Sequence, residues 1–194
     1  MDLGNNQLTG TIPAELGLLT ALTYLGLYGN QLTSTIPTQL GQLPALKNLD
    51  LDNNQLTRTI PTHLGQLTTL SYLDLDNNQL TGTIPTQLGQ LVILRYLLLS
   101  DNQLSGTIPL ALTQLTNLKN YLYLHKNNLT GQVPSEFCES PFPDWRADGW
   151  SANNRLYADC MSKVQCDCCD LCYDESGNRF CWNGSEYTSN LGDC

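Results

Sequence analysis

The sequence predicts an α/β repeat protein, a solenoid with a parallel β-sheet on its concave face and short helical turns on its convex face, closed by a disulfide-rich C-terminal cap. Internal repeats of 20–50 residues are typical of solenoids. A proline recurs at a fixed position in each repeat, and all eight cysteines lie in the last 57 residues. The repeat pattern itself, Leu-x-Leu-x-x-Asn-x-Leu, returns about every 24 residues, from Leu25, Leu49, Leu73, Leu97 and Leu122, with a partial copy from Leu3.

Alternating side chains predict one strand in each repeat. In Leu49-Asp50-Leu51-Asp52 the apolar residues alternate with polar ones, as a strand buried on one side requires. Stacking such strands about 4.8 Å apart gives a parallel sheet. The leucine and isoleucine columns then fill a core that no single repeat could bury.

Two further columns predict the bends of each coil. The asparagine after each strand can bond backbone groups of its own turn and of adjacent coils. Proline excludes a helix and fixes extended backbone, and Gly-x-Leu steps such as residues 41–43 suit the tight helical turns that follow. The asparagines are Asn6, Asn30, Asn54, Asn78, Asn102 and Asn127, and the prolines are Pro13, Pro37, Pro61, Pro85, Pro109 and Pro134.

The last repeat contains one residue more than the others, within residues 118–122. An insertion inside the strand would reverse the direction of every later side chain. We therefore expect a bulge to absorb the extra residue.

Repeats such as residues 49–61 resemble the plant-type leucine-rich-repeat (LRR) family, whose repeats run LxxLxLxxNxLxGxIPxxLGxL. The resemblance implies a right-handed LRR solenoid of about six repeats over residues 1–134. In residues 135–194, Ala158-Asp159-Cys160 followed by Cys-x-Cys-Cys-x-x-Cys is similar to the cap of extracellular LRR proteins of diatoms and related algae. We therefore expect a repeat domain and a cysteine-rich cap.

Cysteine content and charge indicate an extracellular chain. An even number of cysteines in a short acidic segment favours disulfides over zinc. We expect Cys138 to pair with Cys160, and Cys166, Cys168, Cys169, Cys172, Cys181 and Cys194 to pair among themselves. The sequons at Asn128 and Asn183 fit a secreted glycoprotein.

The net charge of −9 disfavours binding to nucleic acid or to anionic lipid. No run approaches the roughly 18 apolar residues of a membrane helix. No secretion signal opens the sequence, so we expect either a secreted chain whose signal was removed or a fragment of an ectodomain. The only histidines, His63 and His125, stand in no metal-ligand or nucleophile motif. We expect no enzyme, no cofactor and no resident metal ion, so function must be argued from a surface.

The outward strand positions form the predicted binding surface. Tyrosine supplies rigid contact area with a polar tip, although exposed aromatic residues can also simply pack on one another across strands. We expect a protein, peptide or glycan to bind there, through Tyr24, Tyr28, Asn48, Asp50, Asp52, Tyr72, Asp74, Asp76, Tyr96, Ser100, Tyr121, Tyr123 and His125.

Four of these residues, Asp50, Asp52, Asp74 and Asp76, should form a two-by-two patch of carboxylates. Neighbours on one face of a sheet lie about 6.6 Å apart along a strand and about 4.8 Å apart between strands. Like charges at this spacing invite a cationic group or a calcium ion. A solvated acidic face that keeps the sheet soluble is the favoured alternative to calcium.

A ladder of Thr-x-Thr steps suggests ice binding as another function. Threonines in regular rows on a flat face resemble the surface of some ice-binding proteins, and some plant LRR proteins bind ice. Threonine also suits strands for structural reasons, and Arg58 interrupts the ladder. The pairs are Thr9 and Thr11, Thr33 and Thr35, Thr57 and Thr59, Thr81 and Thr83, and Ser105 and Thr107.

The first coil offers a third possibility. Leu3, Leu8, Ile12, Leu16 and Leu22 belong to core columns, and no cap precedes them in this sequence. An exposed apolar layer beside an unpaired strand edge promotes association. A structural subunit that assembles head to tail is therefore an alternative to the favoured recognition module, as is ice binding.

Overall fold

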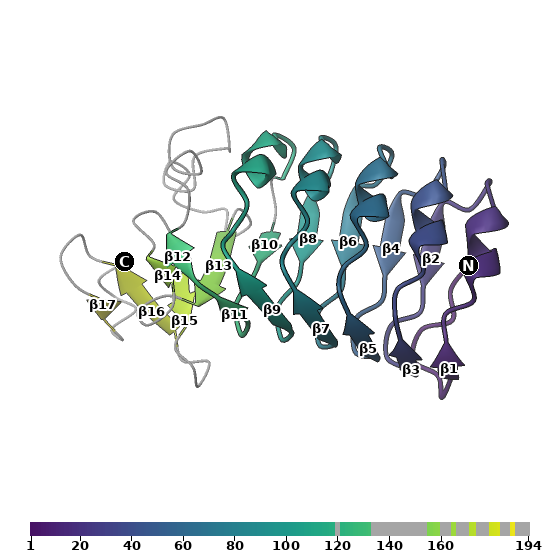
Figure 1. Ribbon diagram of the computed structural model, residues 1–194, viewed down its shortest axis with the longest axis horizontal. Coiled ribbons are helices and arrows are strands. Elements are labelled where there is room, and N and C mark those ends of the chain that lie inside the picture. Colours follow the sequence, from purple (N-terminus) through teal and green to yellow (C-terminus); the bar gives the residue numbers. More distant parts are fainter. Residues whose placement is uncertain are drawn as a thin grey trace.

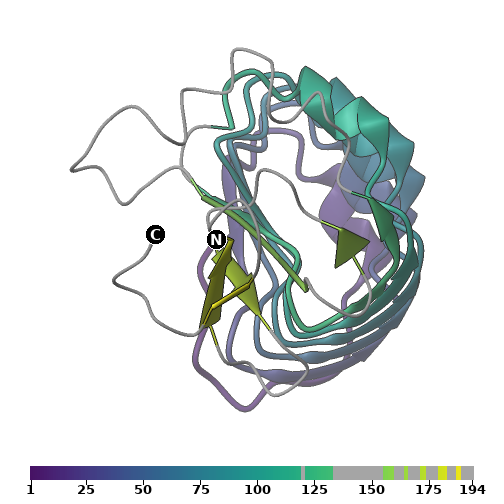
Figure 2. The same ribbon diagram turned by 90° about the vertical axis from the view of Figure 1, so that its left-hand side faces the viewer.

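The structure, a computed structural model, describes residues 1–118, 121–132, 155–159, 164–165, 171–173, 179–182 and 187–188. The chain winds as the predicted solenoid, with its coils side by side along the long axis (Figure 1) and stacked behind one another when viewed along that axis (Figure 2). Each central coil contains a strand of the main sheet, a strand of a second sheet and a 3₁₀ helix. The short helical turns on the convex face are confirmed.

The main sheet is parallel over the repeats. Its nine strands among the described residues are β2 (Tyr24–Gly26), β4 (Asn48–Asp50), β6 (Tyr72–Asp74), β8 (Tyr96–Leu98), β10 (Tyr121–Tyr123), β13 (Arg155–Asp159), β15 (Leu171–Tyr173), β16 (Arg179–Trp182) and β17 (Tyr187–Thr188). The last two, β16 and β17, pair antiparallel.

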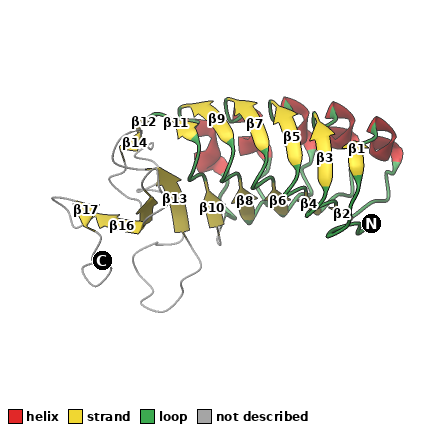
Figure 3. Cartoon of the chain, turned by 90° about the horizontal axis from the view of Figure 1, so that it is seen from below, coloured by secondary structure: helices red, strands yellow, loops and turns green. Residues whose placement is uncertain are grey.

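A second parallel sheet, which the repeat pattern did not predict, runs beside the helices (Figure 3). Its strands are β1 (Thr9–Thr11), β3 (Gln31–Ser34), β5 (Gln55–Arg58), β7 (Gln79–Gly82), β9 (Gln103–Gly106) and β11 (Asn128–Leu129). The 3₁₀ helices are η1 (Ala14–Leu18), η2 (Thr38–Gln42), η3 (Thr62–Gln66), η4 (Thr86–Gln90) and η5 (Leu110–Gln114). Two short strands, β12 (Gly131–Gln132) and β14 (Val164–Gln165), pair separately.

The core is a set of apolar columns that neighbouring coils bury together. Leu49, Leu73 and Leu97 are each 0% exposed, in register across β4, β6 and β8. Burying a leucine side chain contributes roughly 1.5–3 kcal/mol. Because each coil covers its neighbours, the stack gains this stability only as a whole.

The asparagine column closes the bend after each main-sheet strand, as predicted. The Asn78 side chain accepts a hydrogen bond from the Leu56 backbone N–H at 3.0 Å and donates to the carbonyl oxygen of Leu51 at 3.0 Å. It also donates to the carbonyl oxygens of Leu75 and Asp76 in its own coil. Asn30, Asn54, Asn102 and Asn127 make the same set.

Close packing of η1 to η4 against the next coil requires glycine. A Cβ on Gly65 would lie 2.4 Å from the carbonyl oxygen of Gln87 in the next coil. The preceding Pro61, at φ −64° and ψ 129°, holds the extended backbone that leads into η3. Proline and glycine thus set the convex side at the positions that the sequence predicts.

The last repeat stays in register, with Tyr121 opposite Tyr96 and Leu122 opposite Leu97. The insertion therefore does not shift the strand. Lys119 and Asn120, where the expected bulge would fall, lie outside the described residues.

Main-sheet pairing continues beyond residue 134, because β13 pairs parallel with β10. Cys172 lies on β15 and Cys181 on β16. The other cysteines of the expected disulfides, Cys138, Cys160, Cys166, Cys168, Cys169 and Cys194, lie outside the described residues, as does the sequon residue Asn183. The pairing scheme and the cap over residues 135–194 stay predictions.

The apolar core-column residues of the first coil are exposed only in part, whereas we expected an exposed apolar layer there. Leu3 is 40% exposed and Leu8 is 38% exposed, whereas their counterparts Leu27 and Leu32 are each 4% exposed. Ile12, however, is buried, and Leu16 and Leu22 pack partly against the core, because the second coil covers them.

The asparagine column provides a first test of the fold. We expect Asn78→Ala to lower the free energy of unfolding by about 3 kcal/mol or more, because it leaves several buried backbone groups without partners. Its matched control is Gln79→Ala, one residue later and exposed. Chemical denaturation measures both, and an equal small loss in the two variants would show that the asparagine column is dispensable.

Candidate binding surface on the concave sheet

The structure places four of the predicted tyrosines, Tyr24, Tyr72, Tyr96 and Tyr121, in one column across the main sheet together with Asn48. Tyr72 pairs in register with Tyr96, and their ring centroids lie 5.4 Å apart at an interplanar angle of 50°. Farther along, Tyr123 meets His125 edge to face, with centroids 5.7 Å apart. These contacts fix the aromatic rings as a firm surface, while each ring in these two contacts stays partly exposed.

The remaining members of the first column flank this centre. Tyr24 pairs with Asn48, which pairs with Tyr72. Tyr121 follows Tyr96 in register. Tyr28 lies in the bend after β2, and its ring covers Gly4 of the first coil. A Cβ on Gly4 would lie 2.2 Å from the Cζ atom of Tyr28. All of the predicted concave residues therefore belong to one continuous sheet and the bends that follow its strands.

The carboxylates converge as predicted, but they are less accessible. Asp50 and Asp74 are register partners on β4 and β6. Asp74 is only 7% exposed, because the Tyr72 hydroxyl donates to it at 2.7 Å and the Asp76 backbone N–H donates at 3.1 Å. Ser100 is 2% exposed, and its N–H donates to Asp76 at 2.5 Å. Asp74 and Ser100 are therefore buried, unlike the exposed positions that strand alternation predicts, and their part in binding stays a prediction.

Burial and mutual repulsion disfavour ionisation of this cluster. Burial, with the Asp74 carboxylate nearby, raises the pKa of Asp50 from 3.8 to about 7. The same two causes raise the pKa of Asp76 to about 8, against the hydrogen bonds from Ser100. Burial also raises the pKa of Tyr72, and its bond to Asp74 adds to the effect. Burial and mutual repulsion therefore favour the protonated form of these carboxyl groups more than in water.

Within the described ranges, no group of three or more His, Cys, Asp or Glu side chains could hold a metal ion.

None of the helices in the same ranges is long and apolar enough to cross a membrane.

The threonine ladder lies on the second sheet and divides into two columns. In the first column the hydroxyls are used internally: Thr33, Thr57 and Ser105 donate to carbonyl oxygens of the preceding coil, at 3.1 to 3.3 Å. The second column, Thr11, Thr35, Thr59, Thr83 and Thr107, is exposed. This second column presents a regular row of threonine side chains to solvent.

The residue between the two threonines of each step has a special backbone conformation that the sequence pattern did not predict. This residue adopts the left-handed region in every described coil, with φ of 77° at Gly82 and 79° at Gly106. Arg58 occupies the same conformation at φ 69°, where a side chain is strained. Glycine at most of the other positions of this column was the signal that could have revealed the turn.

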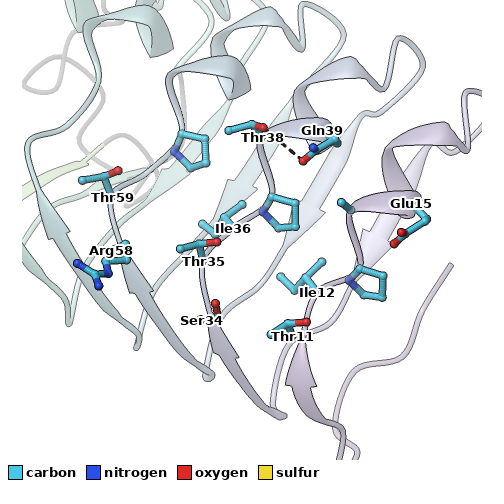
Figure 4. A pocket seen from close by; sticks show the side chains of 14 residues that line it. Thr11, Ile12, Glu15, Ser34, Thr35, Ile36, Thr38, Gln39, Arg58 and Thr59 are labelled. Carbon is cyan, nitrogen blue, oxygen red and sulfur yellow. Dashed lines mark hydrogen bonds between the residues drawn. The ribbon is translucent and has the colours of Figure 1, made fainter.

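A groove of about 710 Å³ runs between the second sheet and the helices (Figure 4). Thr11, Thr35 and Thr59 line it with Ile36, and Glu15 and Arg58 supply its charges. Glu15 and Arg58 belong to different coils, on η1 and β5. The groove is open and lined by both polar and apolar side chains, and its two charged side chains come from different coils.

The pKa shifts predict how stability depends on pH. Between about pH 4 and pH 8 the unfolded chain has lost the Asp50 and Asp76 protons that the folded protein still binds, so stability falls as pH rises. Thermal unfolding should show that Asp50→Asn/Asp76→Asn flattens this decline and stabilises the protein at the alkaline end. Glu15→Gln, on the opposite face, should keep the wild-type slope. The same slope in both variants would contradict the assignment.

Comparisons with known proteins agree with this architecture. Leucine rich repeat profiles match residues 44–104 and residues 1–19, 21–43, 94–115 and 120–140. No curated protein matches the chain significantly. The chain is similar to the plant peptide hormone receptor RGFR1 in complex with RGF2, at 38% identity and a TM-score of 0.71 over 84% of this chain and 24% of the receptor chain.

Two further solved structures are informative. The Arabidopsis receptor kinase HAESA, in complex with the peptide hormone IDA and the co-receptor SERK1, is 42% identical, with a TM-score of 0.66 over 68% of this chain and 22% of that chain. A plant ice-binding protein is 30% identical, with a TM-score of 0.66 over 86% of this chain and 49% of that chain.

This chain thus spans about a quarter of the length of the receptor chains that it matches. The repeat profiles, in contrast, cover more than half of its own length. The chain belongs to the leucine-rich repeat family.

Proposed function

We propose that this chain is an extracellular recognition module whose concave sheet binds a peptide that carries basic side chains. The observation that supports the proposal is the packed pair of Tyr72 and Tyr96 beside the partly exposed carboxylates of Asp50 and Asp52, on one continuous sheet and the bend that follows its strand. The similar receptors RGFR1 and HAESA were solved with bound peptides, which favours a peptide over a glycan as the class of ligand.

The chemistry of the patch favours a cationic ligand. A lysine or arginine placed near Asp50 and Asp52, which are both partly exposed, would lower their pKa toward the ordinary range. Binding would then release protons, so affinity should rise as pH rises. Tyr72 and Tyr96 supply contact area at a small entropic cost.

A random peptide display library tests this proposal directly. Peptides captured by the protein should be enriched in lysine and arginine. Asp50→Asn/Asp52→Asn should weaken their binding by about tenfold or more at low salt, and by less at high salt. The charge-matched control is Glu15→Gln on η1, which should bind as the wild type does.

Two results would move the binding surface away from the concave sheet. One is a set of captured peptides with no basic residues in excess. The other is equal affinity in the wild type, the double variant and the control.

Ice binding is the second candidate, supported by the exposed threonine column and by similarity to a plant ice-binding protein. Against it, three residues of the other column, Thr33, Thr57 and Ser105, use their hydroxyls in internal hydrogen bonds. The exposed Arg58 also lies between Thr57 and Thr59 in the sequence.

We expect no inhibition of ice recrystallisation by the wild-type protein. If inhibition occurs and Thr59→Tyr/Thr83→Tyr abolishes it, while Tyr72→Ala does not, the second sheet rather than the concave sheet is the functional face.

A further inference from the structure

One position of the second sheet changes its chemistry in the last described coil. The first residue of each strand from β3 to β9 is an exposed glutamine, namely Gln31, Gln55, Gln79 and Gln103. In β11 this residue is Asn128, and Leu129-Thr130 follows it. Asparagine in place of glutamine creates Asn-Leu-Thr, the acceptor triplet for an N-linked glycan.

The strand geometry turns this asparagine toward solvent. Asn128 pairs in register with Ser105 on β9. Leu129 is 0% exposed and belongs to the core, so Asn128 and Thr130, its exposed neighbours, point the other way.

The two adjacent asparagines have different roles. Asn127 is buried, and its amide bonds the Leu104 N–H and the carbonyl oxygens of Leu99 and Leu124. Asn128 makes no such bond to the residues that the structure describes. A glycan on Asn128 would therefore cost the fold neither packing nor a hydrogen bond.

We propose that Asn128 carries an N-linked glycan and that this glycan stands on the second sheet. Its Nδ2 forms a bond to the anomeric carbon of a lipid-diphosphate-linked oligosaccharide. The bond from that carbon to the diphosphate oxygen breaks, the lipid diphosphate leaves, and the amide loses one proton.

The position of the glycan has a functional consequence. A hydrated oligosaccharide on β11 would lie beside β9, where Asn128 pairs with Ser105, and would obstruct a flat ligand along that face. The main sheet lies across the core from β11 and stays open (Figures 1 and 3). Whether Asn128 is glycosylated does not depend on the proposed function. Only the inference that the glycan leaves the ligand-binding sheet open rests on it.

Secretion of the 194-residue chain from a eukaryotic host, behind an added leader, tests the modification. Mass spectrometry should find a glycan on the peptide containing Asn128, and peptide N-glycosidase should leave aspartate there. Asn128→Gln restores the residue that the other coils use and should lose the glycan. Gln79→Asn creates the same Asn-Leu-Thr triplet over residues 79–81, in the middle of the same sheet, and should gain one.

An unmodified Asn128 in the secreted wild-type protein overturns the proposal, most clearly if the Gln79→Asn variant is modified at its introduced triplet. The choice of face has its own readout. Library-selected peptides should bind the glycosylated wild type and Asn128→Gln with equal affinity. Weaker binding to the glycosylated form would place the ligand on the second sheet and overturn that part alone.

Discussion

The structure depends on one constraint: each bend after a main-sheet strand leaves backbone groups that neither sheet can pair. Asn54, Asn78 and Asn102 meet this need by bonding their own bend and the coil before it. Each asparagine thus joins two coils with one buried side chain. Unpaired backbone groups inside a protein are costly, so the leucine columns can stack only where these amides are present.

This constraint separates structural from functional positions along the repeat. Inward leucines, the asparagine, the proline and the helix glycine are fixed by packing, whereas the outward strand positions vary from coil to coil. Asn48, Tyr72 and Tyr96 occupy one such column, and Asp50, Asp74 and Leu98 occupy the next. The second sheet is more uniform, and its first threonine column works for the fold. Variation on the concave sheet is what selective recognition of a ligand requires.

The sequence predicted the period, the main-sheet strands, the asparagine bonds and the helical turns, because each depends on local pattern. The second sheet was not predicted, because its strands end at a left-handed residue such as Gly82 or Arg58 rather than in a simple alternation. The burial of Asp74 was also missed. It arises because the Tyr72 hydroxyl, two residues earlier on the same strand, reaches over it, and alternation alone does not show this contact.

The central claim is that ligand recognition belongs to the concave sheet and not to the second sheet. Backbone amide shifts in NMR spectra of the isotope-labelled protein, titrated with a library-selected basic peptide, test this most directly. Shifts concentrated on β4, β6 and β8 and on the bends after them are the predicted result. Shifts concentrated on β5, β7 and β9, with the main sheet unchanged, would contradict the account.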